Sequence, residues 1–167
     1  MRVVWICAIA TSLAPGASAR ARFTVDGATT TPSNAVATIQ PRTGAPCYSW
    51  LRIYFYSSPL SASDSAAAAK GRIQSVKAGW SAVLQLTLDK ASTIWQVDLS
   101  VPGHTCTVAQ SDQEAKTALP EFQFNGTHIR LAGKGSYVCD MKSLGIPNQS
   151  FAWDVNLDIP VVEGAPR

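Results

Sequence analysis

The chain contains few charged residues, and this shortage excludes several classes of protein. Asp, Glu, Lys and Arg together make up 15% of the sequence, against 46% hydrophobic residues. A disordered chain has the opposite balance, low hydrophobicity with high net charge, so a folded domain is expected. The formal net charge is only +3 and the basic residues are scattered, so no basic cluster predicts binding to nucleic acid.

Long apolar runs are also missing, apart from a short one at the N-terminus. Residues 3–14 form an apolar run of twelve that follows Arg2 and precedes the small residues at 17–19. This layout is typical of a secretory signal peptide, with cleavage expected before Arg20. The run is shorter than the roughly 20 residues that cross a bilayer, and no later run is longer, so no membrane span is predicted. We therefore expect an exported protein, secreted or periplasmic.

Cysteine is scarce, and signal cleavage would leave only three. Cys7 lies in the expected signal peptide, and Cys47, Cys106 and Cys139 follow it. An exported chain meets oxidising conditions, so one disulfide and one free thiol is the simplest arrangement, with three pairings open. We favour a Cys106–Cys139 bond, because both residues lie in expected strands. Cys47 is then a free thiol, either buried and inert, reactive, or bonded to another chain.

Short strands separated by turns predict an all-β fold. About nine short strands with regular turn signals are typical of an antiparallel β-sandwich, with a closed β-barrel as the alternative. One short helical insert is expected at 61–70, where Ser61 and Asp64 resemble a capping box before a run of alanines. The expected parts are the signal peptide (1–19), a segment with one or two short strands (20–45), the β core (46–163) and a tail (164–167).

Three stretches rich in glycine or polar residues are predicted to be turns or loops. Asn125-Gly126 favours a type I′ turn in a hairpin over 121–131, because both residue types tolerate positive φ. Gly133-Lys134-Gly135 is predicted to be a turn. The stretch 110–120 is predicted to be a polar loop.

One strand, at 47–56, carries bulky side chains on both faces. Its odd positions from 51 to 55 are apolar and are expected in the core, whereas its even positions form an aromatic and basic stripe. Flat rings with polar edges stack on sugars, and Trp, Tyr and Arg are frequent hot-spot residues. The alternative is a second buried face beneath the helix or an opposing sheet. The residues expected to bind a glycan or a protein are Trp50, Arg52, Tyr54 and Tyr56.

Recognisable motifs for catalysis or metal binding are absent from the sequence. There is no nucleophile elbow and no phosphate-binding loop. His104 and Cys106 share a strand face, but nothing supplies the two further ligands that a structural zinc site needs. Asp154, Asn156 and Asp158 begin like a calcium loop, but their alternation with apolar residues indicates the wet face of a strand. We therefore expect no metal and no cofactor.

These features favour a non-enzymatic binding or structural domain. We expect a monomer whose partner is an extracellular or periplasmic protein or glycan. A small secreted hydrolase with loop-borne catalytic residues is one alternative, and a β-barrel carrier of a small apolar ligand is another. Asn125 and Asn148 each begin a triplet that matches the glycosylation acceptor sequence.

Overall fold

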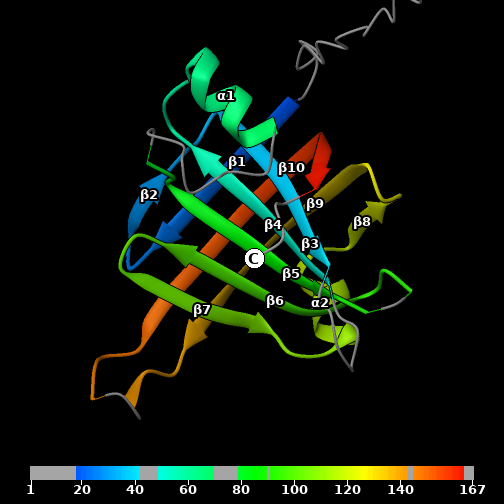
Figure 1. Ribbon diagram of the computed structural model, residues 1–167. Coiled ribbons are helices and arrows are strands. Elements are labelled where there is room, and N and C mark those ends of the chain that lie inside the picture. The colour runs from blue at the N-terminus through cyan, green and yellow to red at the C-terminus, as the bar shows by residue number, and fades with distance from the viewer. Residues whose placement is uncertain (1–17, 42–48, 70–78, 90, 143–144, 164–167) are drawn as a thin grey trace, which may run out of the picture.

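A single curled sheet of ten strands dominates the computed structural model, with two short helices beside it in the described residues (Figure 1). The structure describes residues 18–41, 49–69, 79–89, 91–142 and 145–163. In chain order the elements are β1 (Ser18–Val25), β2 (Ala28–Thr30), β3 (Asn34–Pro41), β4 (Ser49–Tyr56), α1 (Ala62–Ala69), β5 (Ala82–Leu88), β6 (Ile94–Val101), β7 (His104–Ala109), α2 (Asp112–Ala118), β8 (Glu121–Phe124), β9 (His128–Cys139) and β10 (Gln149–Glu163).

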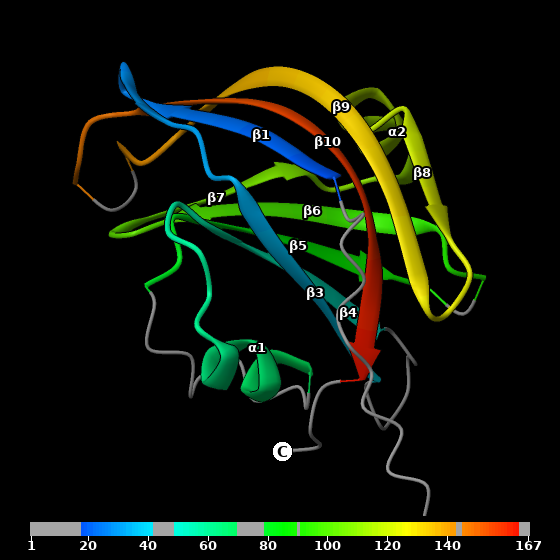
Figure 2. The ribbon, with the colours of Figure 1, turned by 90° about the horizontal axis from the view of Figure 1, so that it is seen from above.

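The long strand β10 joins the two walls of the sheet. The strand order is β2-β1-β10-β3-β4-β5-β6-β7, and β9 with β8 branches from β10. Residues 149–160 of β10 pair with β9, residues 151–158 pair with β1, and residues 161–163 pair in parallel with β3. The sheet therefore curls into an open half-barrel, in which β1, β9 and β10 face β5, β6 and β7 across the core (Figure 2).

The predicted all-β class is confirmed, and so is the helical insert, which is α1. Its start is capped as expected: the backbone N–H of Asp64 donates to Ser61 Oγ at 3.1 Å, and that hydroxyl donates to Asp64 Oδ2 at 2.8 Å. A two-sheet sandwich is not confirmed, because the strand ladder continues through β10 from one wall to the other. The described sheet is also not a closed barrel, since β7 ends the strand order and pairs only with β6.

The core fills the inside of the half-barrel and follows the predicted alternation of the strands. Leu51, Ile53 and Phe55 of β4 are fully buried. Phe23 of β1 meets Phe55 edge to face, with ring centres 4.9 Å apart, so the two walls are in direct contact. The same alternation holds in β10, where the predicted inward residues are buried: Trp153, Val155, Leu157 and Ile159.

One inward position is predicted wrongly, and a β-bulge is the reason. Strict alternation along β6 places Trp95 in the core, but its side chain is 46% exposed. Thr87 pairs with Gln96 whereas Leu88 pairs with Ile94, so Trp95 is the extra residue of a bulge. The bulge turns Ile94 into the core in its place, where it is 5% exposed.

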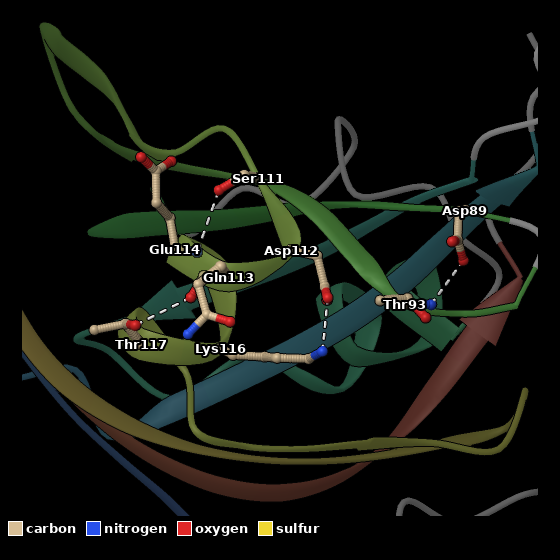
Figure 3. Close-up of polar contacts among 8 residues, drawn as sticks. All are labelled: Asp89, Thr93, Ser111, Asp112, Gln113, Glu114, Lys116 and Thr117. Atoms are coloured by element: carbon tan, nitrogen blue, oxygen red, sulfur yellow. Dashed lines mark hydrogen bonds and ion pairs between the residues drawn. The ribbon is translucent and has the colours of Figure 1, made fainter.

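Helix α2 lies where a polar loop was predicted. Its first turn is closed by side chains: Ser111 Oγ accepts from the backbone N–H of Glu114 at 3.3 Å (Figure 3), and Glu114 Oε2 accepts from that of Gln110 at 2.7 Å. An ion pair between residues one turn apart also stabilises the helix, with Lys116 Nζ 2.6 Å from Asp112 Oδ2 (Figure 3). Ser111 and Glu114 have the spacing of a capping box, which is the local signal for this helix.

The predicted turn at Gly133-Lys134-Gly135 is also wrong, because β9 runs through it without a break. Both glycines lie where another element comes very close. A Cβ atom at Gly133 would lie 2.5 Å from the carbonyl oxygen of Ala118, and one at Gly135 would lie 2.5 Å from the ring of Trp153. These glycines therefore permit close packing and do not reverse the chain.

The hairpin over β8 and β9 is confirmed, but its turn differs from the predicted type I′. Phe124 pairs with Ile129, and of the two turn residues only Gly126 has a positive φ, of 96°. The Asn125 side chain closes the turn instead. Its Oδ1 accepts from the backbone N–H groups of Thr127 at 3.1 Å and His128 at 2.8 Å.

Several predictions fall on residues outside the described ranges, namely the apolar run of the signal peptide, the thiol of Cys47 and the tail at 164–167. Ser18 and Ala19, which the expected cleavage would remove, lie in β1 and pair with Asp158 and Leu157. Cleavage before Arg20 would therefore shorten β1 by two residues. In the described ranges, no helix has the length and apolarity that a membrane crossing requires.

Candidate functional site

The predicted binding residues lie on β4, and the structure separates them into two groups. Trp50, Arg52 and Tyr54 are half-buried on the outer face of the half-barrel. Tyr56 is only 1% exposed, so its ring does not belong to an accessible stripe. Tyr48, which is also at an even position of the predicted strand 47–56, lies outside the described residues. The candidate site is therefore the part of β4 centred on Arg52.

Tyr56 is enclosed near the start of α1. The pKa of its hydroxyl is raised to about 12, chiefly by burial and also by the nearby Tyr54 and Asp64, whose negative charges disfavour the phenolate. Asp64 belongs to α1, so the helix lies close to this end of β4. At this end of β4 the aromatic face is therefore covered. A buried face beneath the helix was the alternative to a binding surface that the sequence left open.

We expect the hydroxyl of Tyr56 to titrate near pH 12, whereas an unfolded tyrosine has a pKa of about 10. Because the folded pKa is the higher one, this contribution to stability is complete below pH 10 and is lost as the pH rises toward 12. The difference in near-ultraviolet absorbance between wild type and Tyr56→Phe isolates this step. A step near pH 10 would contradict the burial of the hydroxyl.

Arg52 is held in place by neutral groups. Its Nε donates to Gln85 Oε1 at 2.7 Å, and its Nη1 donates to Gln40 Oε1 at 3.0 Å. The guanidinium also lies over the ring of Trp50, 5.2 Å from the ring centre, which is a cation–π distance. Two amides and one ring thus fix the direction of the charge without neutralising it.

The acid nearest along this network, Asp98, is satisfied by other donors. Cross-strand pairing places Arg52, Gln85, Asp98 and Thr107 in one row across β4 to β7. Gln85 donates to Asp98 at 3.1 Å, Thr107 donates at 2.6 Å, and Gln96 donates at 2.9 Å. Asp98 is 8% exposed, so these bonds satisfy a buried carboxylate. Gln85 therefore separates the cation from the anion.

No acidic side chain of the sequence neutralises Arg52. All eleven Asp and Glu residues lie in the described ranges. Within those ranges the ion pairs are Lys116 with Asp112 and His128 with Asp158. Arg52 is thus a half-buried cation whose partners are neutral, although charged side chains are seldom buried without a counter-charge.

Cavities also lie elsewhere on the described surface. One of about 550 Å³ opens at the end of the half-barrel where β1 turns into β2 and β6 turns into β7. Two smaller ones flank α2. One of about 320 Å³ reaches Trp153 beside β9, and the other of about 480 Å³ lies between α2 and Ile94. Figure 3 shows two polar contacts among residues that include lining residues of the 480 Å³ cavity: Lys116 donates to Asp112, and the backbone N–H of Thr93 donates to Asp89.

The positions weighed as metal ligands are otherwise engaged. Cys106 is bonded to Cys139, the pair favoured from the sequence, with Cα atoms 6.0 Å apart. His104 Nδ1 contacts the side-chain amide of Gln149. Asp154 lies opposite Arg22 on one side and Lys134 on the other, on the exposed face of β10. No cluster of three or more metal-ligating side chains occurs among the residues that the structure describes.

Comparison with known proteins finds no matching family model, no similar curated protein and no similar solved structure. The function therefore has to be argued from the chemistry of the site itself. On the outer face of β4, that chemistry is an oriented guanidinium over the ring of Trp50, with Tyr54 two residues further along the strand.

Proposed function

We propose that this protein is a non-enzymatic binding domain that holds an anionic ligand on the outer face of β4. The observation that carries the proposal is that Arg52 is half-buried and oriented, yet has no carboxylate partner. Partial burial lowers the local dielectric, which strengthens the attraction of an incoming anion. The planar guanidinium matches a carboxylate in particular, because two parallel N–H groups can bind its two oxygens.

The neighbouring residues favour a ring-bearing ligand. Gln85 and Gln40 engage Nε and Nη1 of Arg52, so the described contacts leave Nη2 available to a ligand. Tyr54 follows two residues later on the same face of β4 and is half-buried. Its ring can pack against a sugar while Arg52 binds the acidic group. An acidic sugar therefore provides both a ring for Tyr54 and an acidic group for Arg52. The sequence predicted a glycan or protein ligand, and this proposal specifies an acidic glycan.

Replacing Arg52 is expected to weaken this binding strongly without unfolding the protein. The probe is glucuronate, with glucose as its uncharged counterpart, titrated against the protein and followed by NMR. In wild type, glucuronate should shift the indole N–H signal of Trp50, against which Arg52 lies, whereas glucose should not, because it has no carboxylate for Arg52. Arg52→Gln should weaken glucuronate binding by about 10- to 100-fold, the loss of a charge-assisted hydrogen bond.

A matched control is Arg130→Gln, which removes the same charge from an exposed position on β9. It should leave glucuronate binding unchanged if the site is on β4. Arg52→Lys keeps the charge but loses the planar fork, so it should restore only part of the affinity. Equal binding by wild type and Arg52→Gln would exclude this face as the ligand site.

A further inference from the structure

The cavity at the end of the half-barrel combines one aromatic wall with apolar and polar linings. It lies where the β1–β2 turn, the start of β5 and the β6–β7 turn meet, at the left of Figure 1. Trp80 forms the aromatic wall and is 37% exposed. Val25 and Val101, from opposite walls of the sheet, supply apolar lining. Its volume of about 550 Å³ lies within the usual range of small-molecule sites.

Asp26 offers a hydrogen-bond acceptor at this cavity. Its Oδ1 accepts from the backbone N–H of Ser150 at 2.8 Å and from the Ser150 hydroxyl at 3.2 Å. Both bonds fix the carboxylate on the β1–β2 turn, where Asp26 has a positive φ of 48°. The described contacts use only Oδ1, so Oδ2 is left as an acceptor for a ligand.

His104 offers a second polar group at the same cavity. The side-chain amide of Gln149 contacts its Nδ1. Because Gln149 engages Nδ1, Nε2 is the ring nitrogen that His104 can present to a ligand in the cavity that it lines.

We propose that this cavity is a second binding site, which takes an uncharged polyhydroxylated ring, a neutral mono- or disaccharide. The indole of Trp80 matches the apolar face of a sugar ring. A sugar hydroxyl both donates and accepts, so adjacent hydroxyls can bond to Asp26 Oδ2 and to Nε2 of His104 together, whether that nitrogen donates or accepts. An anion is disfavoured by the carboxylate of Asp26.

This site is independent of the one proposed on β4. None of the Arg52 contacts lines the cavity, and the ligands differ in charge, an anion on β4 and an uncharged sugar in the cavity. The two proposals therefore fail separately: Arg52→Gln should leave neutral-sugar binding unchanged, and variants in the cavity should leave glucuronate binding unchanged.

The test is an NMR titration of the full chain with glucose, galactose, mannose, cellobiose and lactose. At least one of these sugars should shift the indole N–H of Trp80 and the ring signals of His104. Trp80→Ala should weaken that binding at least about tenfold. The matched control is Trp95→Ala, which removes another indole that is 46% exposed and should not change the affinity.

A second variant keeps the test decisive if Trp80→Ala does not fold. Asp26→Asn keeps an acceptor for Ser150 and tolerates the positive φ, but it removes the carboxylate and should also weaken sugar binding. The proposal is overturned if no sugar shifts Trp80, or if the shifts persist unchanged in a folded cavity variant. Binding of choline at Trp80 in place of sugars would likewise overturn it.

Discussion

Replacing both bonded cysteines with alanine is expected to lower the free energy of unfolding by about 3–4 kcal/mol. Cys106 and Cys139 are 33 residues apart, and a bond across a loop of that length restricts the unfolded chain by about this amount on the chain-entropy model. Both residues are buried, at 1% and 9% exposed, so alanine is preferred to serine because it adds no hydroxyl to the core.

The measurement is denaturant unfolding of the double variant Cys106→Ala/Cys139→Ala beside wild type, without reductant. Wild type in reductant should approach the variant, because the bond is then absent from both. Cys47→Ala is the control and should keep most of the wild-type stability. If the double variant unfolded at the same denaturant concentration as wild type, the bond would not contribute to stability.

The position of this disulfide explains why it matters for a half-barrel. β7 is the last strand of the order, and β8 accompanies β9 only over residues 129–132. In the described structure, the edges of β7 and of the second half of β9 are therefore left without a strand between them. The bond from Cys106 to Cys139 joins these two edges, so it limits how far the two walls can separate.

Elements whose residues follow a local pattern could be predicted from the sequence. β4 and β10 show the alternation of a strand with one face in the core, and burial follows it over residues 50–55 of β4 and 151–160 of β10. α1 has its capping residues and alanines in one short window. α2 had an equally local signal in Ser111 and Glu114, which sequence reasoning missed because the stretch around it is polar.

Features that depend on pairing between distant strands could not be predicted in this way. Trp95 faces outward only because of the register between β5 and β6, which its own strand does not reveal. β10 pairs with three different strands, and this makes one curled sheet where a sandwich was expected. Neither the bulge nor the branching leaves a periodic signal along the chain.

The residues of the candidate site also divide into those that a local pattern predicts and those that depend on the pairing of distant strands. Trp50, Arg52 and Tyr54 could be identified from alternation along one strand. Gln40 and Gln85, which orient the guanidinium, come from the two neighbouring strands and needed the register. The burial of Tyr56 near α1 and the cavity around Trp80 depend on packing between separate segments, so sequence reasoning had no access to either.

Substituting Gly133 with alanine is expected to cost about 2–3 kcal/mol of stability, the upper part of the usual range for overpacking a core site. A Cβ atom there would lie 2.5 Å from the carbonyl oxygen of Ala118 and 2.9 Å from the Cα of Leu119. Both are backbone atoms, so no side-chain rotation can relieve the contact. The chain leaving α2 would have to move away from β9, and Leu119, which is 2% exposed, would move with it.

The matched control is Gly79→Ala, because Gly79 has no positive φ and no atom within 4 Å of the position that a Cβ would take. That variant should unfold within about 0.5 kcal/mol of wild type, as exposed substitutions usually do. The same denaturant measurement compares the two. A Gly133→Ala protein as stable as Gly79→Ala would mean that α2 does not pack closely against β9.

The contact between Gly133 and Ala118 also affects a neighbouring bond, since the indole N–H of Trp153 donates to the carbonyl of Ala118 at 3.1 Å. Gly133 therefore sets the distance at which the end of α2 bonds to β10 and covers this end of the core.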